Sequence, residues 1–311
     1  MLFRSNLATV NDSIIVGGTY GGTAFGNNLI LTNGAWLFGG GGNVVVGGLF
    51  NGGNGSSNLL KIVGGNATSV FNVGGALSIG INYSGASTGN LVVVDGAGIA
   101  GSALLTNATS VSIGTVDAAT FNLGNGLIVT NGGYFYSGNL VIGGTGSGNP
   151  SSLATGNFYK IDGGAVGSVV SNGTITIGNG GTSAYSAQIY NNFMTVTNAQ
   201  IKSGALTLGG ASGAGDAHGI SNSSVSVYAN TLWDFQNNNV TISTSGSSNN
   251  QVTLFGGAMS NISIFTVGNA NGSGSLNLNG GTLNLTNKNS DTLDTSETKL
   301  WVGTVSGEIG R

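Results

Sequence analysis

Apolar and polar residues alternate over short stretches along the whole chain, and glycine or asparagine closes most of these stretches. Alternation over a few residues is typical of β-strands, whose successive side chains point to opposite faces. No segment carries a sustained 3.6-residue apolar period, and the many glycines and β-branched residues disfavour helix throughout. The pattern therefore predicts an all-β protein built from many short strands.

The clearest internal repeat is a run of apolar, any, apolar and glycine. Its copies end at Gly17, Gly47, Gly80, Gly114, Gly143, Gly178, Gly209, Gly268 and Gly303, with one degenerate copy ending at Ser243. Nine steps of about 32 residues lead from Gly17 to Gly303. A fixed period of this length is the signature of a solenoid or a related repeat architecture.

A second strand signal lies between successive copies of the first. It reads NLLKIVGG from Asn58, NLVVVDGA from Asn90 and NFYKIDGG from Asn157, and related segments start at Asn28, Gly126 and Asn192. A third, short apolar patch often follows, at 36–38, 69–71, 134–136 and 168–170. Each repeat is thus predicted to contain a strand, a turn, a short strand, a turn, a strand ending in glycine, and a variable loop.

Three short strands per unit, stacked on their equivalents in the next unit, predict a parallel β-helix (β-solenoid) of about nine to ten coils. In the second signal we expect the third and fifth residues to point inward and the fourth outward. The inward set is Ile30, Thr32, Leu60, Ile62, Val92, Val94, Ile128, Thr130, Tyr159 and Ile161. The second residue is often apolar as well, as at Leu29, Leu59, Leu91 and Leu127, which predicts a covering loop or a bend at that place.

Composition removes several classes of function. Charged residues make up 5% of the chain and the net charge is −3, so seven basic residues cannot form the stripe that nucleic acid requires. The chain has no cysteine, which excludes disulfides and thiolate metal sites. No apolar run approaches the about 20 residues of a membrane-spanning helix.

The two ends, MLFRS at 1–5 and EIGR at 308–311, resemble in-frame translations of a common short-read sequencing adapter. We therefore predict artefactual ends at 1–5 and 308–311 and one solenoid domain over 6–307, as part of a longer gene. Within it, the polar segment 287–299 holds five of the 17 charged residues and is predicted to be an exposed insertion. It lacks the spacing of a calcium-binding loop.

The segments NGGTLNLTN at 279–287 and SGALTLGG at 203–210 resemble the Gly-Gly-Thr-Leu-x-apolar signature of autotransporter-associated β-strand repeats. The resemblance covers most of residues 7–306. It implies a right-handed β-helical passenger segment that is displayed on, or released from, the surface of a Gram-negative-type bacterium. Adhesive or matrix-forming roles are common in that family.

Lys160 and Asp162 form an isolated charged pair that could serve as base and acid. Asp95 takes the place of Asp162 two repeats earlier, and Lys61 takes the place of Lys160 three repeats earlier. At ~4.8 Å per coil the two aspartates would be about 10 Å apart, beyond the about 5 to 9.5 Å of carboxylate pairs in glycoside hydrolysis. We interpret Asp162 as a turn residue in place of asparagine, and Lys160 as an outward strand residue that aids solubility.

The other chemical candidates have structural interpretations too. His218, the only histidine, lies with Asp216 in a variable Gly-rich loop and is interpreted as a solvated loop residue. The aromatic residues are expected to pack in the core or in grooves rather than to stack on sugars: Trp36, Trp233, Trp301, Tyr134, Tyr136, Tyr185 and Tyr190. Threonine pairs such as TIT at 174–176 do not recur outward in successive units, which disfavours ice binding. The sequence assigns no catalytic, cofactor-binding or metal-ligating residue.

The sequence therefore favours a non-enzymatic, surface-exposed or secreted β-solenoid, an adhesin-like or matrix-forming segment of a larger exported protein. Its expected partners are glycans, host or abiotic surfaces, or copies of itself. A polysaccharide-degrading β-helix enzyme is the alternative from a different class, and it requires two acidic residues and a cation that converge on one face. An inert structural spacer is the third hypothesis.

Overall fold

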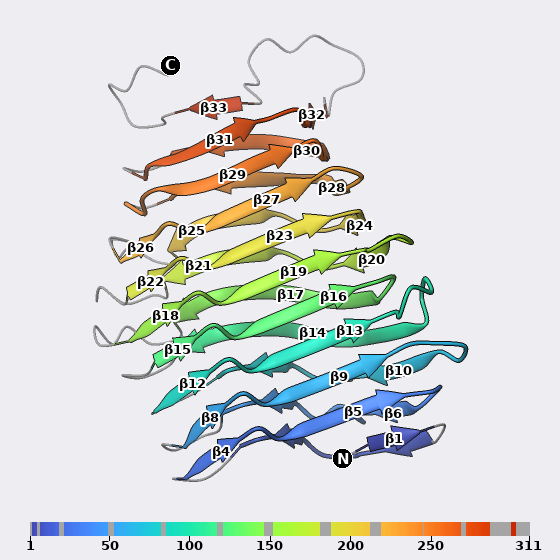
Figure 1. Ribbon diagram of the computed structural model, residues 1–311. Helices are drawn as coiled ribbons and strands as arrows, with labels where there is room; N and C mark the ends of the chain where they lie inside the picture. The colour runs from blue at the N-terminus through green and yellow to red at the C-terminus, as the bar shows by residue number, and fades with distance from the viewer. Residues whose placement is uncertain are drawn as a thin grey trace.

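The computed structural model shows short strands that wind around a common axis, each pairing with its counterpart in the next turn (Figure 1). The structure describes residues 2–4, 7–18, 22–48, 53–81, 85–116, 121–145, 152–180, 188–211, 219–244, 246–268, 272–286 and 300–302. Over these ranges the secondary structure is all strand and turn, with no helix. The predicted all-β parallel β-solenoid with a repeat near 32 residues is confirmed.

Three parallel sheets form the walls of the solenoid, and we name them A, B and C. Sheet A has ten strands in the order β1 (Leu2–Arg4), β5 (Asn28–Thr32), β9 (Leu59–Val63), β13 (Leu91–Asp95), β16 (Gly126–Thr130), β19 (Phe158–Asp162), β23 (Phe193–Thr197), β27 (Ser224–Tyr228), β29 (Asn250–Phe255) and β31 (Gly274–Leu278). These strands correspond to the second sequence signal.

Sheet B has sixteen strands in two columns, which several long strands join. The first column holds β2 (Leu7–Thr9), β6 (Trp36–Phe38), β10 (Ser69–Asn72), β14 (Ala103–Val116), β17 (Tyr134–Thr145), β20 (Ser168–Ser171), β24 (Ala199–Lys202), β28 (Leu232–Ile242), β30 (Ala258–Val267) and β32 (Thr282–Leu285). The second column holds β3 (Ile14–Val16), β7 (Val44–Val46), β11 (Leu77–Ile79), β21 (Ile175–Gly180), β25 (Leu206–Ala211) and β33 (Leu300–Val302), and the later halves of β14, β17, β28 and β30 continue it.

Sheet C was not predicted, because its strands lie in what the sequence presents as variable loops. It contains β4 (Thr23–Phe25), β8 (Asn54–Ser56), β12 (Ala86–Thr88), β15 (Phe121–Leu123), β18 (Leu153–Thr155), β22 (Gln188–Tyr190) and β26 (Ile220–Ser221). Segments of two or three residues carry too little alternation to be read as strands. All three sheets together build about six turns, fewer than the nine to ten coils predicted.

The interior is a continuous apolar core. Inward side chains of sheets A and B are almost all fully buried, as the alternating burial of β9, β13 and β27 shows. Its largest buried side chains are Trp233, Tyr159, Phe71, Phe135, Phe235 and Phe265. The rings of Phe135 and Tyr159 meet edge to face at 6.0 Å, and those of Trp233 and Phe235 stack at 4.8 Å.

The predicted direction of the sheet A side chains is right for some strands and wrong for others. Leu60, Ile62, Val92, Val94, Tyr159 and Ile161 are buried as expected. Ile30, Thr32, Ile128 and Thr130 point outward instead, and Leu29, Leu31, Leu127 and Val129 are the buried residues. The ladder pairs Leu29 with Leu60, and Leu127 with Val92 and Tyr159, so β5 and β16 are shifted by one residue from the predicted alignment.

This shift explains two of the four apolar residues at the second place of the second sequence signal. Leu29 and Leu127 are ordinary core residues once the alignment is corrected. Leu59 and Leu91 do point outward and are half-buried on the face of sheet A. The sequence predicted a covering loop or a bend at this place, and Leu29 and Leu127 require neither, because both are core residues.

A buried asparagine ladder sets the true alignment. It begins at the exposed Asn27 and continues through the fully buried Asn58, Asn90, Asn125, Asn157 and Asn192, each of which lies one residue before a sheet A strand. Each Oδ1 accepts from the backbone N–H of the preceding asparagine; Asn157 Oδ1, for example, accepts from the N and the Nδ2 of Asn125, both at 3.1 Å. The ladder satisfies polar groups that would otherwise be buried without partners.

The glycine of the first sequence pattern packs against this ladder. Gly114 has φ 61°, a left-handed conformation, and a Cβ built on it would lie 2.0 Å from Cγ of Asn157. Gly17, Gly47, Gly80 and Gly143 contact Asn58, Asn90, Asn125 and Asn192 in the same way. The two sequence markers thus recur together because they are in contact at one corner of the coils from Gly17 to Gly143.

Candidate functional site

Lys160 and Asp162 lie on the outer face of sheet A, where each has a structural partner. The Lys160 ammonium lies 5.1 Å from the ring centroid of Phe158 and 5.7 Å from that of Phe193, and the two rings stack at 5.5 Å. Cation–π contacts of this kind stabilise partly exposed aromatic rings. Lys160 points outward, as predicted, and covers an apolar surface.

Asp162 closes its strand by accepting a hydrogen bond. Its Oδ1 accepts from the N–H of Gly164 at 3.1 Å, and Gly164 adopts φ 59°. The prediction that Asp replaces a turn asparagine is right about the turn and wrong about the position. Asn131 itself takes the left-handed conformation at φ 50°, whereas Asp162 is paired with Thr130, one place earlier.

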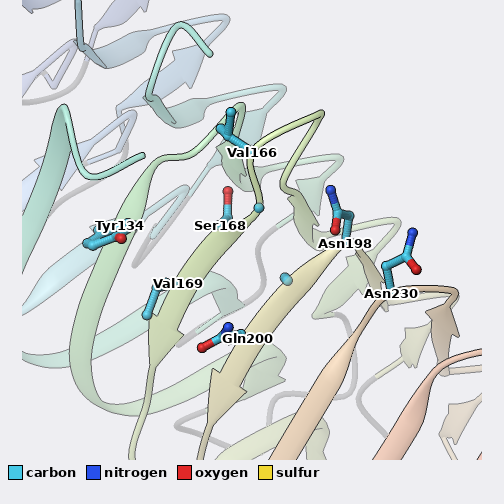
Figure 2. A pocket seen from close by; sticks show the side chains of 9 residues that line it. Tyr134, Val166, Ser168, Val169, Asn198, Gln200 and Asn230 are labelled. Carbon is cyan, nitrogen blue, oxygen red and sulfur yellow. The ribbon is translucent and has the colours of Figure 1, made fainter. Parts of the chain in front are cut away.

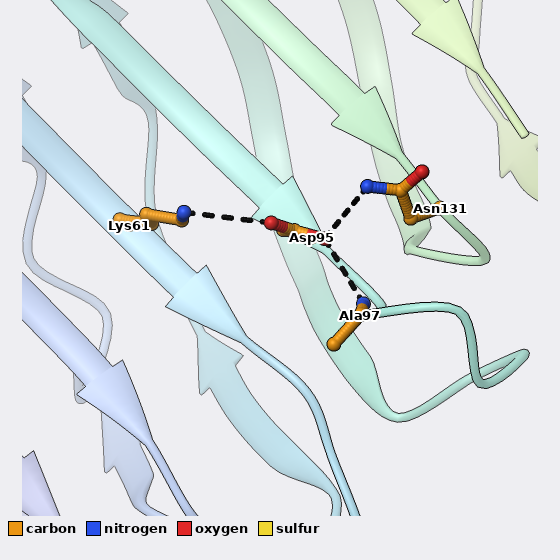
Figure 3. A network of polar contacts seen from close by, with 4 residues as sticks. All are labelled: Lys61, Asp95, Ala97 and Asn131. Carbon is orange, nitrogen blue, oxygen red and sulfur yellow. Dashed lines mark hydrogen bonds and ion pairs between the residues drawn. The ribbon is translucent and has the colours of Figure 1, made fainter. Parts of the chain in front are cut away.

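Asp95 forms the most connected charged site of the described residues (Figure 3). Its Oδ2 lies 3.4 Å from Nζ of Lys61 on β9, and its Oδ1 accepts from the N–H of Ala97 at 2.9 Å and from Nδ2 of Asn131 at 3.2 Å. The carboxylate therefore joins three successive coils. Its charge is matched by Lys61 and its oxygens are engaged by donors, which is the arrangement of a structural cross-link.

The aspartate pair behind the enzyme hypothesis is separated as expected. One strand, β16, lies between β13 and β19, so Asp95 and Asp162 are two ladder steps apart, or about 10 Å. The described part of the chain contains no group of three or more His, Asp or Glu side chains that could hold a metal ion. His218, Asp216 and the insertion 287–299 lie outside the described residues.

The candidate aromatic residues divide between core and surface. Trp233 is fully buried, and its Nε1 donates to the Ser203 hydroxyl at 2.8 Å. Trp36 is 45% exposed and donates to the carbonyl of Thr68 at 3.1 Å. Tyr134, Tyr136 and Tyr190 are half-buried, while Tyr185 and the side chain of Trp301 lie outside the described set. Burial and the neighbouring Tyr134 raise the pKa of Tyr136.

A column of small hydroxyl residues runs along the outer face of the second column of sheet B. Its members are Ser78 and Ser112 in consecutive coils and, after one coil in which Val141 takes this place, Thr176, Thr207, Thr241 and Thr266. We call this the hydroxyl column. The sequence correctly indicated that threonine pairs do not recur, but it missed this single column, because variable loops shift the spacing from one coil to the next.

An open groove of about 320 Å³ lies on the first column of sheet B (Figure 2). Tyr134, Val169 and Gln200 are cross-strand neighbours on β17, β20 and β24 and form its floor. Its rim is formed by turns that carry Val166, Asn198 and Asn230, and Gly167, Ser168 and Ala199 complete the lining. Asn198 and Asn230 adopt left-handed φ values of 46° and 58°, which turn asparagines tolerate well.

The groove lining contains side-chain amides, one aromatic ring, a hydroxyl and aliphatic groups, with no charged side chain among them. Sequence reasoning missed it, because its residues are contributed by four coils and become neighbours only through stacking. Aromatic rings and amides at strand ends in adjacent repeats are the one signal that could have indicated it.

Among the described residues, no helix has the length and apolar character needed to cross a bilayer. Comparisons of the chain with protein-family models, with curated proteins and with solved structures found no match.

Proposed function

We propose that the protein is a non-enzymatic β-solenoid rod that serves as an adhesin-like or matrix-forming segment of a larger exported protein. The hydroxyl column is the observation that carries this proposal. It presents small, neutral, hydrogen-bonding groups at the ~4.8 Å spacing of stacked strands over four successive coils, from Thr176 to Thr266. Such a face suits many weak contacts with a hydroxylated or hydrated surface.

The rod would act through its length and through the many similar contacts that it presents along that length. We propose nine to ten coils over the whole chain, which is supported by the ten strands of sheet A. Nine steps of ~4.8 Å give a length of about 43 Å. Contacts that are individually weak add up when they are held on one rigid scaffold, because each further contact becomes intramolecular.

The location and partners follow from the repeat resemblance. We propose display on, or release from, the surface of a Gram-negative-type bacterium, as in autotransporter passenger segments. Glycans and host or abiotic surfaces are the proposed partners, and self-association would give a matrix-forming role. The neutral groups of the hydroxyl column support partners that are themselves neutral and hydroxylated.

The enzyme alternative has no comparable support. It requires two carboxylates and a cation on one face, and the described neighbours of Asp95 are one cation, one amide and a backbone N–H. Release of reducing ends or unsaturated products from a polysaccharide by the purified chain would contradict the proposed function.

Adsorption of the purified chain to cellulose and chitin particles tests the proposal. We expect the unmodified chain to be retained on the particles. Retention should fall strongly in the double variant Thr176→Lys with Thr241→Lys, which keeps Thr207, because two bulky charges interrupt the hydroxyl column. The matched control is Thr130→Lys with Thr197→Lys, which places the same two charges on alternate strands of sheet A. Failure of the unmodified chain to adsorb to any polysaccharide or plastic surface would refute the proposal.

A further inference from the structure

We propose that the groove lined by Tyr134, Gln200 and Asn230 binds a short neutral saccharide. This inference rests on the proposed surface-binding function and assigns one site and one class of ligand to it. The groove is distinct from the hydroxyl column, which lies on the other column of sheet B.

The size of the groove limits the ligand. Its volume of about 320 Å³ is at the lower end of small-molecule sites, which range from about 300 to 1,000 Å³. Its floor spans the three strands β17, β20 and β24, or two steps of ~4.8 Å. A site that is small in volume but elongated along the rod suits one or two sugar units and leaves room for the ends of a longer chain to extend into solvent.

The lining selects for a neutral, hydroxylated ligand. Gln200 and Asn230 are exposed, and each side-chain amide offers both donors and an acceptor. Nδ2 of Asn198 donates to the carbonyl of Gly164, which fixes the amide at the rim and leaves its Oδ1 as an acceptor. An anion would find no cationic side chain in this lining, and an apolar ligand would desolvate the amides without compensation.

The Tyr134 ring supplies an apolar wall at one end of the groove. A Cβ built on Gly101 would lie 3.2 Å from the Tyr134 ring, so the ring rests against the preceding coil and has a fixed position. Tyr136 meets it edge to face at 6.4 Å. A held aromatic ring next to planar amides provides both kinds of contact that a sugar ring needs, an apolar contact for its C–H groups and polar partners for its hydroxyls.

A buried hydroxyl beneath the groove provides an independent observation. Ser168 is 1% exposed, and its Oγ has no hydrogen-bond partner among the described residues. Ser69 holds the same place on β10, and there the Oγ accepts from the N–H of Gly34 at 3.2 Å. In Figure 2 the Ser168 hydroxyl points toward the Val166 side of the groove. An unpaired polar atom just beneath the groove can be satisfied through a water molecule that a bound ligand holds in place.

Calorimetric titration of the full chain with cellobiose and chitobiose tests the proposal, with glucuronic acid as the charged probe. We expect millimolar binding of at least one neutral disaccharide and weaker binding of the acid. Gln200→Ala and Asn230→Gly should each weaken the neutral complex by about fivefold, the effect of one lost hydrogen bond. Glycine at 230 keeps the left-handed backbone. The matched control is Gln188→Ala, another exposed glutamine, on sheet C.

Ser168→Ala separates a binding role from a structural one. The variant should weaken saccharide binding and leave the denaturation midpoint unchanged or higher, because it removes an unpaired buried group. Absence of binding by both neutral disaccharides at tens of millimolar, or equal binding by all variants, would overturn the groove assignment. Adsorption to particles reports separately on the rod. Groove variants that adsorb normally while no disaccharide binds would leave the proposed function standing and remove only this inference.

Discussion

Single residues at one corner of the coil determine how the chain stacks. The asparagine ladder is fully buried from Asn58 to Asn192, and it joins each coil to the next through side-chain and backbone hydrogen bonds. The corner glycine leaves the space that the asparagine amide fills. Removal of either partner should therefore disturb two coils at once, which is unusual for a change of one small residue.

Gly114→Ala tests this contact. The added Cβ would lie 2.0 Å from Asn157 Cγ, so we expect the free energy of unfolding to fall by more than about 3 kcal/mol, from a buried clash added to left-handed strain. Gly124→Ala is the matched control, because φ is 62° at Gly124 and 61° at Gly114, and its Cβ would meet no described atom within 4 Å. The control should cost only about 1–2 kcal/mol, the left-handed penalty alone. Equal losses in urea denaturation of the two variants would contradict the role of the ladder.

Tyr159 carries a prediction about alkaline pH. Its hydroxyl is fully buried and has no hydrogen-bond partner among the described residues. Burial raises the pKa of Tyr159 well above its ordinary value, and the smaller, opposite effect of the nearby Asn172 side chain does not cancel this. The folded state therefore keeps a proton that the unfolded chain loses near pH 10. Stability should fall by about 1.4 kcal/mol per pH unit above about pH 10 and be unaffected by this group below it.

Tyr159→Phe provides the measurement. Because the variant removes an unpaired buried hydroxyl, its stability at pH 7 should equal or exceed that of the unmodified chain. Unfolding free energies between pH 8 and pH 11 should show a shallower alkaline decline in Tyr159→Phe. Tyr228→Phe is the control, since Tyr228 is exposed on sheet A. An unchanged alkaline decline in Tyr159→Phe would show that this side chain is not the cause.

At the scale of strands, the sequence was sufficient for sheet A and most of sheet B and insufficient for sheet C. The five-residue strands β9, β13 and β19 alternate clearly, so their existence and direction could be predicted. In β5 and β16 the repeat was aligned on Asn28 and Gly126, one residue late, and a shift of one residue exchanges the inner and outer faces. The ladder partner of Asn58 is Asn27, which only the hydrogen bonds identify.

The candidate sites also divide into those that could be predicted from the sequence and those that could not. The structural roles of Lys160 and Asp162 could be inferred, because equivalent places in the repeats are visible in sequence. The cross-coil bonds of Asp95 and the groove could not, since both depend on side chains that approach one another across strands of different coils. Which residues of different coils become neighbours can be seen only when the different lengths of the intervening loops are taken into account.

The contacts of Asp95 join β9, β13 and the turn after β16. They predict how much this one charged residue contributes to the free energy of unfolding. Asp95→Asn keeps an acceptor for the N–H of Ala97 and removes the charge that Lys61 pairs with, so it should cost less than about 1 kcal/mol. Asp95→Ala also loses the turn bond and the contact with Asn131, and should cost about 1–2 kcal/mol more. Guanidinium denaturation distinguishes the two. Equal losses in Asp95→Asn and Asp95→Ala would show that the ion pair, which both variants lack, contributes more than the turn bond that only Asp95→Ala loses.

At the scale of the whole molecule, each coil contacts mainly its two neighbours, so stability should vary along the stack. One apolar cluster extends from Val16 to Val267 and is covered on both sides over its central part. Toward the C-terminal end the apolar side chains are less buried. Leu278 on β31 is 55% exposed, whereas Leu254, its ladder partner on β29, is fully buried. Leu276, Leu283 and Leu285 are only partly buried against the same core.

Hydrogen exchange should therefore be slowest in the central strands β13, β16 and β19 and fastest in β31 and β32, because local opening costs less where fewer apolar contacts are broken. Two substitutions in one ladder column make the gradient quantitative. Leu254→Ala leaves a cavity in the covered core and should cost about 2–5 kcal/mol, while Leu278→Ala should cost well under half as much. Exchange followed by mass spectrometry should also show that Leu278→Ala accelerates only β29 to β32. Uniform protection along the chain, or equal costs for the two leucines, would mean that the coils unfold as one cooperative unit and not as a stack of coupled layers.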